Sequence, residues 1–214
     1  MSKKSLLIIM DGWGHGKINS SDAIQHAHVP FVKSLYQQYP HSELITCGEL
    51  VGLPEGQMGN SEVGHLNIGA GRIVYQELQR INVAIRNGEL RLNAAFTETL
   101  QYAKTNDKTL HLIGLVSNGG VHSHIEHLKS ICSICHQEDI KKVMIHVFTD
   151  GRDTDPKSGR GFIEELQDHL NNTTGRIASV TGRYYAMDRD KRWERVAKAY
   201  DPVSYTHLRA HETG

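Results

Sequence analysis

Four short apolar runs, each followed by a polar loop that contains glycine, set the strongest limit on what this chain can fold into. Short apolar runs bounded by such loops are typical of strands buried in a sheet, so we predict a strand at each run. The predicted strands are Leu6–Met10, Leu110–Val116, Val143–Phe148 and Ile177–Thr181.

Amphipathic helices are predicted between most of these strands, because apolar residues recur there with the spacing of one helix face. A further helix-rich stretch covers Tyr75 to Asn87. Since strand and helix alternate, we expect an α/β protein with a mostly parallel sheet. The apolar faces are Phe96, Leu100 and Ala103; Ile125, Leu128, Cys132 and Cys135; and Ile163, Leu166 and Leu170.

The loops that follow the strands are the expected place for a ligand. In open α/β sheets, ligands bind beyond the carboxyl ends of the strands. One polar loop there would be an ordinary turn, but four loops that carry Asp, Arg or His favour a shared site. These loops are residues 11–14, 117–122, 149–153 and 181–184.

Charge and composition exclude several classes of protein. Lysine and arginine together number 24, as do aspartate and glutamate, so the formal net charge is zero, and 38% of the residues are hydrophobic. This balance argues against a disordered chain and against the basic surface of a nucleic-acid-binding protein. No apolar run approaches the ~20 residues of a membrane span. We therefore expect a small-molecule substrate, no nucleic acid and no membrane.

The cysteines indicate a reducing compartment. Cys47, Cys132 and Cys135 are too few and too unevenly spaced for a disulfide framework. The apolar run Leu6–Met10 is shorter than the core of a signal peptide and is interrupted at once by Asp11. These features predict a cytoplasmic protein.

Residues 132–136 read Cys-Ser-Ile-Cys-His, the pattern of covalent c-type haem attachment. Attachment normally requires export, and both cysteines fall on the apolar face of a predicted helix, where packing produces the same spacing. The sequence has no second cysteine pair that would complete a zinc site. We expect no haem, and a haem carrier is the alternative from a non-enzyme class.

His122 is the first candidate for binding an anion. With His124 and His127 nearby it could belong to a metal cluster, but Gly119 and Gly120 and a predicted helix start bring backbone N–H groups beside it. That arrangement suits a phosphate or a carboxylate, which is the role we favour for His122.

Arg152 and Arg183 lie next to glycines at strand ends. A planar guanidinium there can hold a phosphate or carboxylate with two hydrogen bonds. We favour a ligand-binding role for both, whereas Lys191, Arg192 and Arg195 are expected to form surface ion pairs.

Asp11 and Ser61 are candidates for metal chemistry. Asp11 follows the first predicted strand, and its carboxylate suits Mg²⁺ or Mn²⁺. Ser61 lies in a glycine-dense segment, residues 48–71, that matches neither the G-x-S-x-G elbow of hydrolases nor a Walker motif. A serine without a neighbouring base needs another means of activation, and a metal that lowers the pKa of the hydroxyl is the usual one.

Five motifs together closely resemble the family of cofactor-independent phosphoglycerate mutases, in the alkaline phosphatase superfamily. The resemblance runs in order from the first predicted strand to Pro202, and departures such as Asn118 and Asp155 touch no assigned role. The motifs are residues 9–14, MGNSEVGHLNIGAGR at 58–72, NGGVHSH at 118–124, FTDGRDT at 148–154 and GRYYAMDRDKRWERV at 182–196.

The resemblance implies a divided architecture. Residues 1–74 would be the first part of a split phosphatase domain with a parallel sheet, and residues 75–202 an incomplete, inserted α/β transferase domain. Residues 203–214 match nothing upstream and look like one reading frame of a sequencing adapter, so we expect a non-native tail.

The resemblance also implies an activity and its residues. The family interconverts 3-phosphoglycerate and 2-phosphoglycerate in glycolysis and gluconeogenesis, as an isomerase that needs no 2,3-bisphosphoglycerate. By analogy, Ser61 is the nucleophile that becomes phosphoserine, and Asp11 and Ser61 ligate one of two divalent metals, Mn²⁺ in many members. The residues that would hold the phosphoglycerate are His122, Arg152, Asp153, Arg183 and Arg189, with Asp153 a candidate general acid or base.

The other metal ligands of the family would lie beyond Pro202. We therefore expect this chain to be inactive by itself, and the complete protein to be a monomer. The alternatives are a metal-dependent phosphatase or another phosphomutase of the superfamily, or a fragment with no function of its own.

Overall fold

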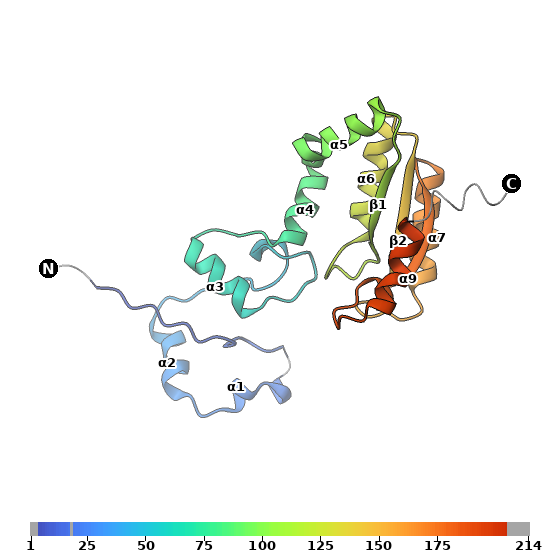
Figure 1. Cartoon of the computed structure of the whole chain (residues 1–214). Helices are drawn as coiled ribbons and strands as arrows, with labels where there is room; N and C mark the ends of the chain where they lie inside the picture. The colour runs from blue at the N-terminus through green and yellow to red at the C-terminus, as the bar shows by residue number, and fades with distance from the viewer. Residues whose placement is uncertain (1–3, 18, 205–214) are drawn as a thin grey trace. The chain divides into compact units, whose positions relative to one another are not determined.

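A computed structural model describes residues 4–17 and 19–204 of the chain (Figure 1). The chain divides between Tyr75 and Gln76 into two compact units. None of the helices in the described residues is long and apolar enough to cross a membrane.

The first unit is built from short helices and loops. Asp22 caps α1, since its side chain accepts hydrogen bonds from the backbone N–H groups of Ile24 and Gln25. Pro30 begins α2, where its missing N–H and fixed φ angle suit the first turn of a helix. The elements, in which η marks a 3-10 helix and α an α-helix, are η1 (Asn19–Ser21), α1 (Ala23–His26), α2 (Pro30–Gln38), η2 (Glu49–Val51) and α3 (Ser61–Ala70).

The strand predicted at Leu6–Met10 is wrong for this structure. The run has no regular secondary structure, and its side chains are exposed, with Leu6 at 84% and Ile8 at 73%. A strand is defined by backbone hydrogen bonds to a neighbouring strand, and residues 4–17 and 19–75 contain no strand. The apolar pattern can be recognised from five neighbouring residues, whereas a strand also needs backbone hydrogen bonds to another segment of the chain.

The second unit contains a three-stranded parallel sheet with the order β1-β2-β3. Leu112 pairs with Ile145 on β2, and Ile145 pairs with Ile177 on β3. The three strands predicted in this half of the chain, and the α/β class, are therefore confirmed. The strands are β1 (Leu110–Val116), β2 (Val143–Thr149) and β3 (Arg176–Gly182).

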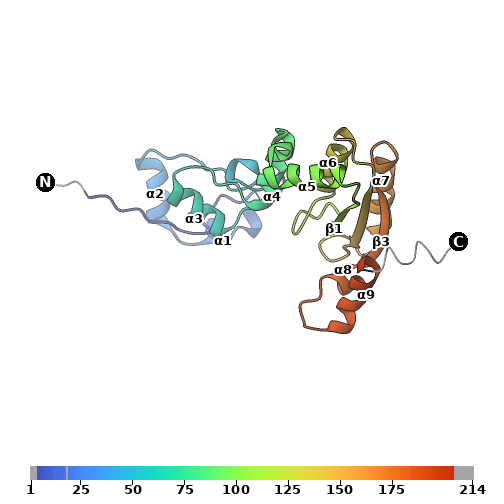
Figure 2. The same ribbon diagram turned by 45° about the horizontal axis from the view of Figure 1, so that its top comes forward.

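The helices predicted in this half are also present. Asn93 caps α5 by accepting from the N–H of Phe96, and His124 caps α6 by accepting from the N–H of Glu126. Figure 2 shows α8 beside the end of β3, with α9 next to it. The elements are α4 (Glu77–Arg86), η3 (Glu89–Leu92), α5 (Ala94–Thr105), α6 (Ile125–Gln137), α7 (Gly159–Asn171), α8 (Arg183–Ala186) and α9 (Trp193–Ser204).

The hydrophobic core of this unit lies between one face of the sheet and the helices α5, α6 and α7. Val143, Ile145 and Val147 of β2 are at most 2% exposed and belong to one cluster with Cys132 of α6 and Leu166 of α7. The helix α6 connects β1 to β2, and α7 connects β2 to β3. Because both bury their apolar faces against β2, they cover the same side of the sheet. The carboxyl ends of all three strands are left at one edge, beyond which the strand-end loops lie.

The two cysteines of the haem-like pattern are part of this core. Cys132 and Cys135 are 0% exposed. Burial raises the pKa of the Cys132 thiol to about 12 and that of the Cys135 thiol to about 11. Both thiols stay protonated and face the core, as their place on the predicted apolar face indicates.

Candidate functional site

In the first unit, Ser61 and Asp11 meet although 50 residues separate them in the sequence. Ser61 is the first residue of α3, directly after Asn60, whose side chain caps the helix by accepting from the N–H of Val63 at 2.9 Å. The Ser61 hydroxyl donates a hydrogen bond to Asp11 Oδ2 at 2.6 Å. The two residues predicted to ligate one metal are therefore in direct contact.

A close approach of the backbone fixes the entry to this helix. A β-carbon at position 59 would lie 1.7 Å from the carbonyl oxygen of Thr46, so only glycine fits there. Gly59 precedes Asn60 and Ser61, and the approach holds the start of α3 against the segment that contains Thr46.

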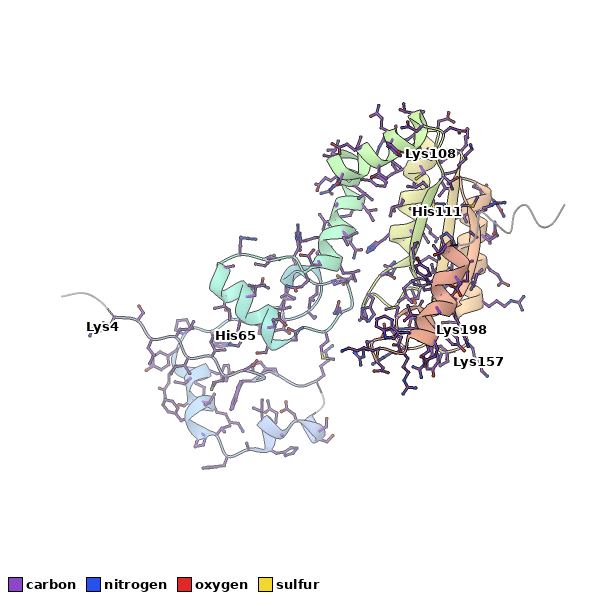
Figure 3. All side chains as sticks on the ribbon, in the orientation of Figure 1. Lys4, His65, Lys108, His111, Lys157 and Lys198 are labelled. Carbon is purple, nitrogen blue, oxygen red and sulfur yellow. The ribbon has the colours of Figure 1, made fainter. Side chains whose placement is uncertain are left out.

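His65, one turn further along α3, was not among the predicted site residues (Figure 3). Its Nδ1 lies 2.9 Å from the carbonyl oxygen of Ser61 and 3.3 Å from Ser61 Oγ. A carbonyl oxygen can only accept, so Nδ1 carries the hydrogen and cannot take the proton of the Ser61 hydroxyl. Asp11 is therefore the acceptor for that hydroxyl. The four-residue spacing from Ser61 is the signal that could have identified His65.

The donor atoms of this pair fit a hard divalent cation. Both Asp11 and Ser61 are exposed, and each offers an oxygen, the ligand that Mg²⁺ and Mn²⁺ prefer. Two oxygens are fewer than the roughly six such a cation takes. Within residues 4–17 and 19–204, no group of three or more His, Cys, Asp or Glu could hold a metal ion. The pair can supply part of a metal site and needs further ligands.

In the second unit, a buried carboxylate joins three strand-end loops. Asp150 is the first residue after β2, and its side chain is 1% exposed. Its Oδ1 accepts from the backbone N–H groups of Arg152 and Asp153, at 3.1 and 3.0 Å, and its Oδ2 accepts from the hydroxyl of Ser117 at 2.7 Å. Ser117 directly follows β1.

Arg183, the first residue of α8 after β3, completes a hydrogen-bonded group with Ser117, Asp150 and Asp153. Its Nη1 donates to Asp150 Oδ1 at 2.8 Å and to Asp153 Oδ2 at 2.6 Å. These two carboxylates raise the pKa of Arg183. Burial alone would raise the pKa of Asp150, but its hydrogen bonds from the Asp153 N–H, Ser117 and Arg183 outweigh burial and lower the pKa to about 2. Both side chains are therefore charged at neutral pH.

His122 lies beside Asp153 in the same group and is partly exposed to solvent. Its Nε2 is 3.8 Å from Asp153 Oδ2, and its side chain is 50% exposed. The loop after β1 can approach Asp153 because residue 119 is glycine, since a β-carbon there would lie 3.2 Å from Asp153 Cβ. The structure thus brings together His122, Asp153 and Arg183 from the loops after three different strands.

Arg152 and Arg189 are not part of this hydrogen-bonded group. The side chain of Arg152 is exposed, and only its backbone contacts Asp150. Arg189 is exposed in the loop between α8 and α9, and among the described residues no hydrogen bond or ion pair joins it to the group. The neighbouring Asp188 shapes that loop by accepting from the N–H of Arg192 and from Arg195 Nη1.

Asp150 and Ser117 were missed by the sequence analysis. Each is the first residue after a strand, at the edge where ligands bind, and that position is a signal that could have identified them. The predicted site residues have side chains suited to contact a ligand, whereas Asp150 and Ser117 contact other loops.

Comparisons with known proteins agree on one family. A sequence model described as "BPG-independent PGAM N-terminus" matches residues 81–213. The 2,3-bisphosphoglycerate-independent phosphoglycerate mutase of Parabacteroides distasonis is 59% identical over 201 residues, and that of Bacteroides fragilis is 55% identical. The 2,3-bisphosphoglycerate-independent phosphoglycerate mutase 1 of Methanosarcina barkeri is 53% identical over 203 residues.

A solved structure gives the same result. The chain resembles a phosphoglycerate mutase of Leishmania mexicana, crystallised at low cobalt concentration, with a TM-score of 0.62 and 35% identity. The match covers 90% of this chain and 37% of that one. Likewise, the P. distasonis match covers 94% of this chain but only 40% of the relative. With a matching family model over most of its length and relatives above 50% identity, the chain belongs to the family of BPG-independent phosphoglycerate mutases and corresponds to their N-terminal part.

Proposed function

We propose that this chain is the N-terminal part of an enzyme that interconverts 3-phosphoglycerate and 2-phosphoglycerate through a phosphoserine at Ser61. The observation that carries the proposal is the 2.6 Å hydrogen bond from Ser61 Oγ to Asp11 Oδ2 at the start of α3. Family membership supports the reaction, which would place the enzyme in glycolysis and gluconeogenesis as a cytoplasmic isomerase without 2,3-bisphosphoglycerate.

The proposed domains follow the resemblance. Residues 1–74 would be the first part of the phosphatase domain, and residues 75–202 part of the transferase domain. Of the proposed non-native tail, residues 203–214, all but the first two lie outside the described residues.

The chain's own residues explain how Ser61 could act as a nucleophile. Its hydroxyl hydrogen points to Asp11, which leaves the oxygen lone pairs for attack on phosphorus. The start of α3 adds backbone N–H groups, which favour an incoming phosphate. Asp11 and Ser61 would hold one of two divalent ions, for which we propose Mn²⁺. When bound, such an ion lowers the pKa of a ligating hydroxyl and offsets negative charge on phosphate oxygens.

The proposed substrate-holding residues are His122, Arg152, Asp153, Arg183 and Arg189. The arginines suit the carboxylate and phosphate of phosphoglycerate. If they keep the glycerate after its phosphate moves to Ser61, return of the phosphate to the 2-hydroxyl is effectively intramolecular. That retention favours a mutase over a phosphatase. We propose a monomer with a small-molecule substrate.

The test uses the full-length product of the gene that carries this sequence, purified and supplied with Mn²⁺. We expect 2-phosphoglycerate from 3-phosphoglycerate without added 2,3-bisphosphoglycerate, loss of activity with a chelator, and no turnover by Ser61→Ala. Release of inorganic phosphate as the main product would instead identify a metal-dependent phosphatase. Activity that survives Ser61→Ala would refute the proposed nucleophile.

A further inference from the structure

Asp150 stands apart from the residues proposed to contact substrate, yet it has the most contacts in the group. It lies in the loop after β2, and it receives hydrogen bonds from the loop after β1 through Ser117 and from the residue after β3 through Arg183. Its side chain is 1% exposed, so it cannot itself reach a ligand.

The charges of Asp150, Asp153 and Arg183 indicate the role of the Asp150 carboxylate. Asp150 and Asp153 both accept from one nitrogen of Arg183, Nη1. The two carboxylates therefore share the positive charge of Arg183, and Asp153, which accepts the shorter bond at 2.6 Å, also lies 3.8 Å from Nε2 of His122. Within the described residues, Nη2 and Nε of Arg183 have no hydrogen-bond acceptor, so these two donors remain for an anion.

Asp150 also fixes the backbone of the residues beside it. The N–H groups of Arg152 and Asp153 both point to its Oδ1, so the turn that presents these two side chains is built around the carboxylate. Its charge strengthens each of these hydrogen bonds relative to a neutral acceptor.

We propose that Asp150 is a positioning residue that acts through Arg183, by holding Nη1 so that the remaining guanidinium donors face the substrate. The role rests on the proposed function, since it assigns Arg183 to substrate binding. Asp150 makes no contact with the reacting atoms.

The test is a double-mutant cycle in the full-length enzyme. Asp150→Asn keeps the shape of the side chain and removes its charge. We expect kcat/KM for 3-phosphoglycerate to fall about 100-fold, chiefly through KM, because a small displacement of a substrate-binding group has an effect of this size. In an Arg183→Ala background, the same change should lower kcat/KM by less than about threefold further, since the two residues act as one unit.

Ile140→Val is the matched control. Ile140 is buried in the core just before β2 and far along the strand from Asp150. It should lower the melting temperature without changing KM, which separates a loss of stability from a loss of positioning. Should Asp150→Asn not fold, Ser117→Ala serves instead, because it removes the 2.7 Å hydrogen bond to Asp150 Oδ2 and should raise KM severalfold.

Two results would overturn the proposal: a KM for Asp150→Asn within about threefold of wild type, or effects of Asp150→Asn and Arg183→Ala that simply multiply. A further readout is independent of activity. The NMR signals of the Arg183 guanidinium should show slow rotation in the wild type and fast rotation in Asp150→Asn. If the wild type does not interconvert the phosphoglycerates, the proposed function fails, while these signals still decide whether Asp150 holds Arg183.

Discussion

At the scale of single residues, the direction of one hydrogen bond separates the roles of Asp11 and His65. Both lie near the Ser61 hydroxyl, but the histidine uses the hydrogen on Nδ1 to reach the backbone carbonyl of Ser61 at 2.9 Å. Asp11 is left as the acceptor at 2.6 Å. Proximity alone would suggest a serine–histidine pair, but the contact with the backbone carbonyl favours the hydrogen on Nδ1 of His65 and leaves Asp11 to accept from Ser61.

This difference predicts unequal effects of two substitutions in the full-length enzyme. Asp11→Asn removes the charged acceptor and a proposed metal ligand, so kcat should fall by at least about 10²-fold. His65→Gln should stay within about tenfold of wild type. The rate of 2-phosphoglycerate formation measures both. Equal losses would mean that His65 is the base for Ser61.

The lowered pKa of Asp150 predicts how the free energy of unfolding depends on pH. Its pKa is about 2 in the folded chain, against 3.8 for an ordinary aspartate, so the folded state favours the charged form. The resulting stabilisation is present above the unfolded pKa and is lost as the pH falls toward 2. It amounts to about 2 kcal/mol. Urea unfolding at several acidic pH values should show a flatter pH dependence for Asp150→Asn than for wild type. The exposed Asp168→Asn is the control, and equal slopes for all three chains would exclude the effect.

At the scale of helices and strands, the elements that were predicted correctly are those whose apolar residues recur with a regular period within one stretch of the sequence. The buried strands β1 to β3 and the apolar faces of α5 to α7 could be predicted because burial imposes a period on neighbouring residues. Leu6–Met10 could not be assigned correctly in this way, because a strand requires a partner elsewhere in the chain. Asp150 and Ser117 were missed for a similar reason, since their contact joins residues 33 apart.

The sheet also carries a polar contact on the face opposite the core helices. His111 of β1, labelled in Figure 3, lies with Nδ1 3.0 Å from Nε2 of His146 on β2, and Nδ1 of His146 lies 2.9 Å from Ser179 Oγ on β3. Burial, and then the neighbouring His111, lower the pKa of His146. One hydrogen links the facing nitrogens of the two rings.

This pair predicts a loss of stability in mild acid. Because the pKa of His146 is lower in the folded state, the unfolded chain binds the proton more readily. Stability should therefore decline as the pH falls below about 6.5 and continue to decline until the folded pKa is reached. His146→Gln should be less stable at neutral pH but show a smaller decline, measured by thermal unfolding. The exposed His136→Gln should behave like wild type, and an unchanged decline in His146→Gln would refute the effect.

At the scale of the whole molecule, the chain spans 40% of the length of relatives such as the P. distasonis enzyme. Each of its two units contains a group of the predicted site residues. Among the described residues, the group in the first unit contains the two proposed metal ligands, Asp11 and Ser61, whereas the group in the second unit holds Asp153 and Arg183 in place with hydrogen bonds of its own.

The 214-residue chain alone should therefore bind Mn²⁺ no more tightly than about the millimolar range, because two oxygen ligands are too few. It should give no detectable conversion of 3-phosphoglycerate. Calorimetric titration with Mn²⁺ and a coupled assay measure both quantities. Micromolar binding that disappears in Asp11→Ala, or steady turnover, would show that the chain holds a complete site.

Mass spectrometry of Ser61 during turnover tests directly whether this serine carries the phosphoryl group. The full-length enzyme is mixed with 3-phosphoglycerate and Mn²⁺, quenched in acid and digested, and the peptide that contains Ser61 is sequenced. We expect a peptide with one added phosphoryl group on Ser61, which is absent in Asp11→Asn and in the reaction without substrate. Phosphate on another residue, or active enzyme that never carries phosphate on Ser61, would contradict it.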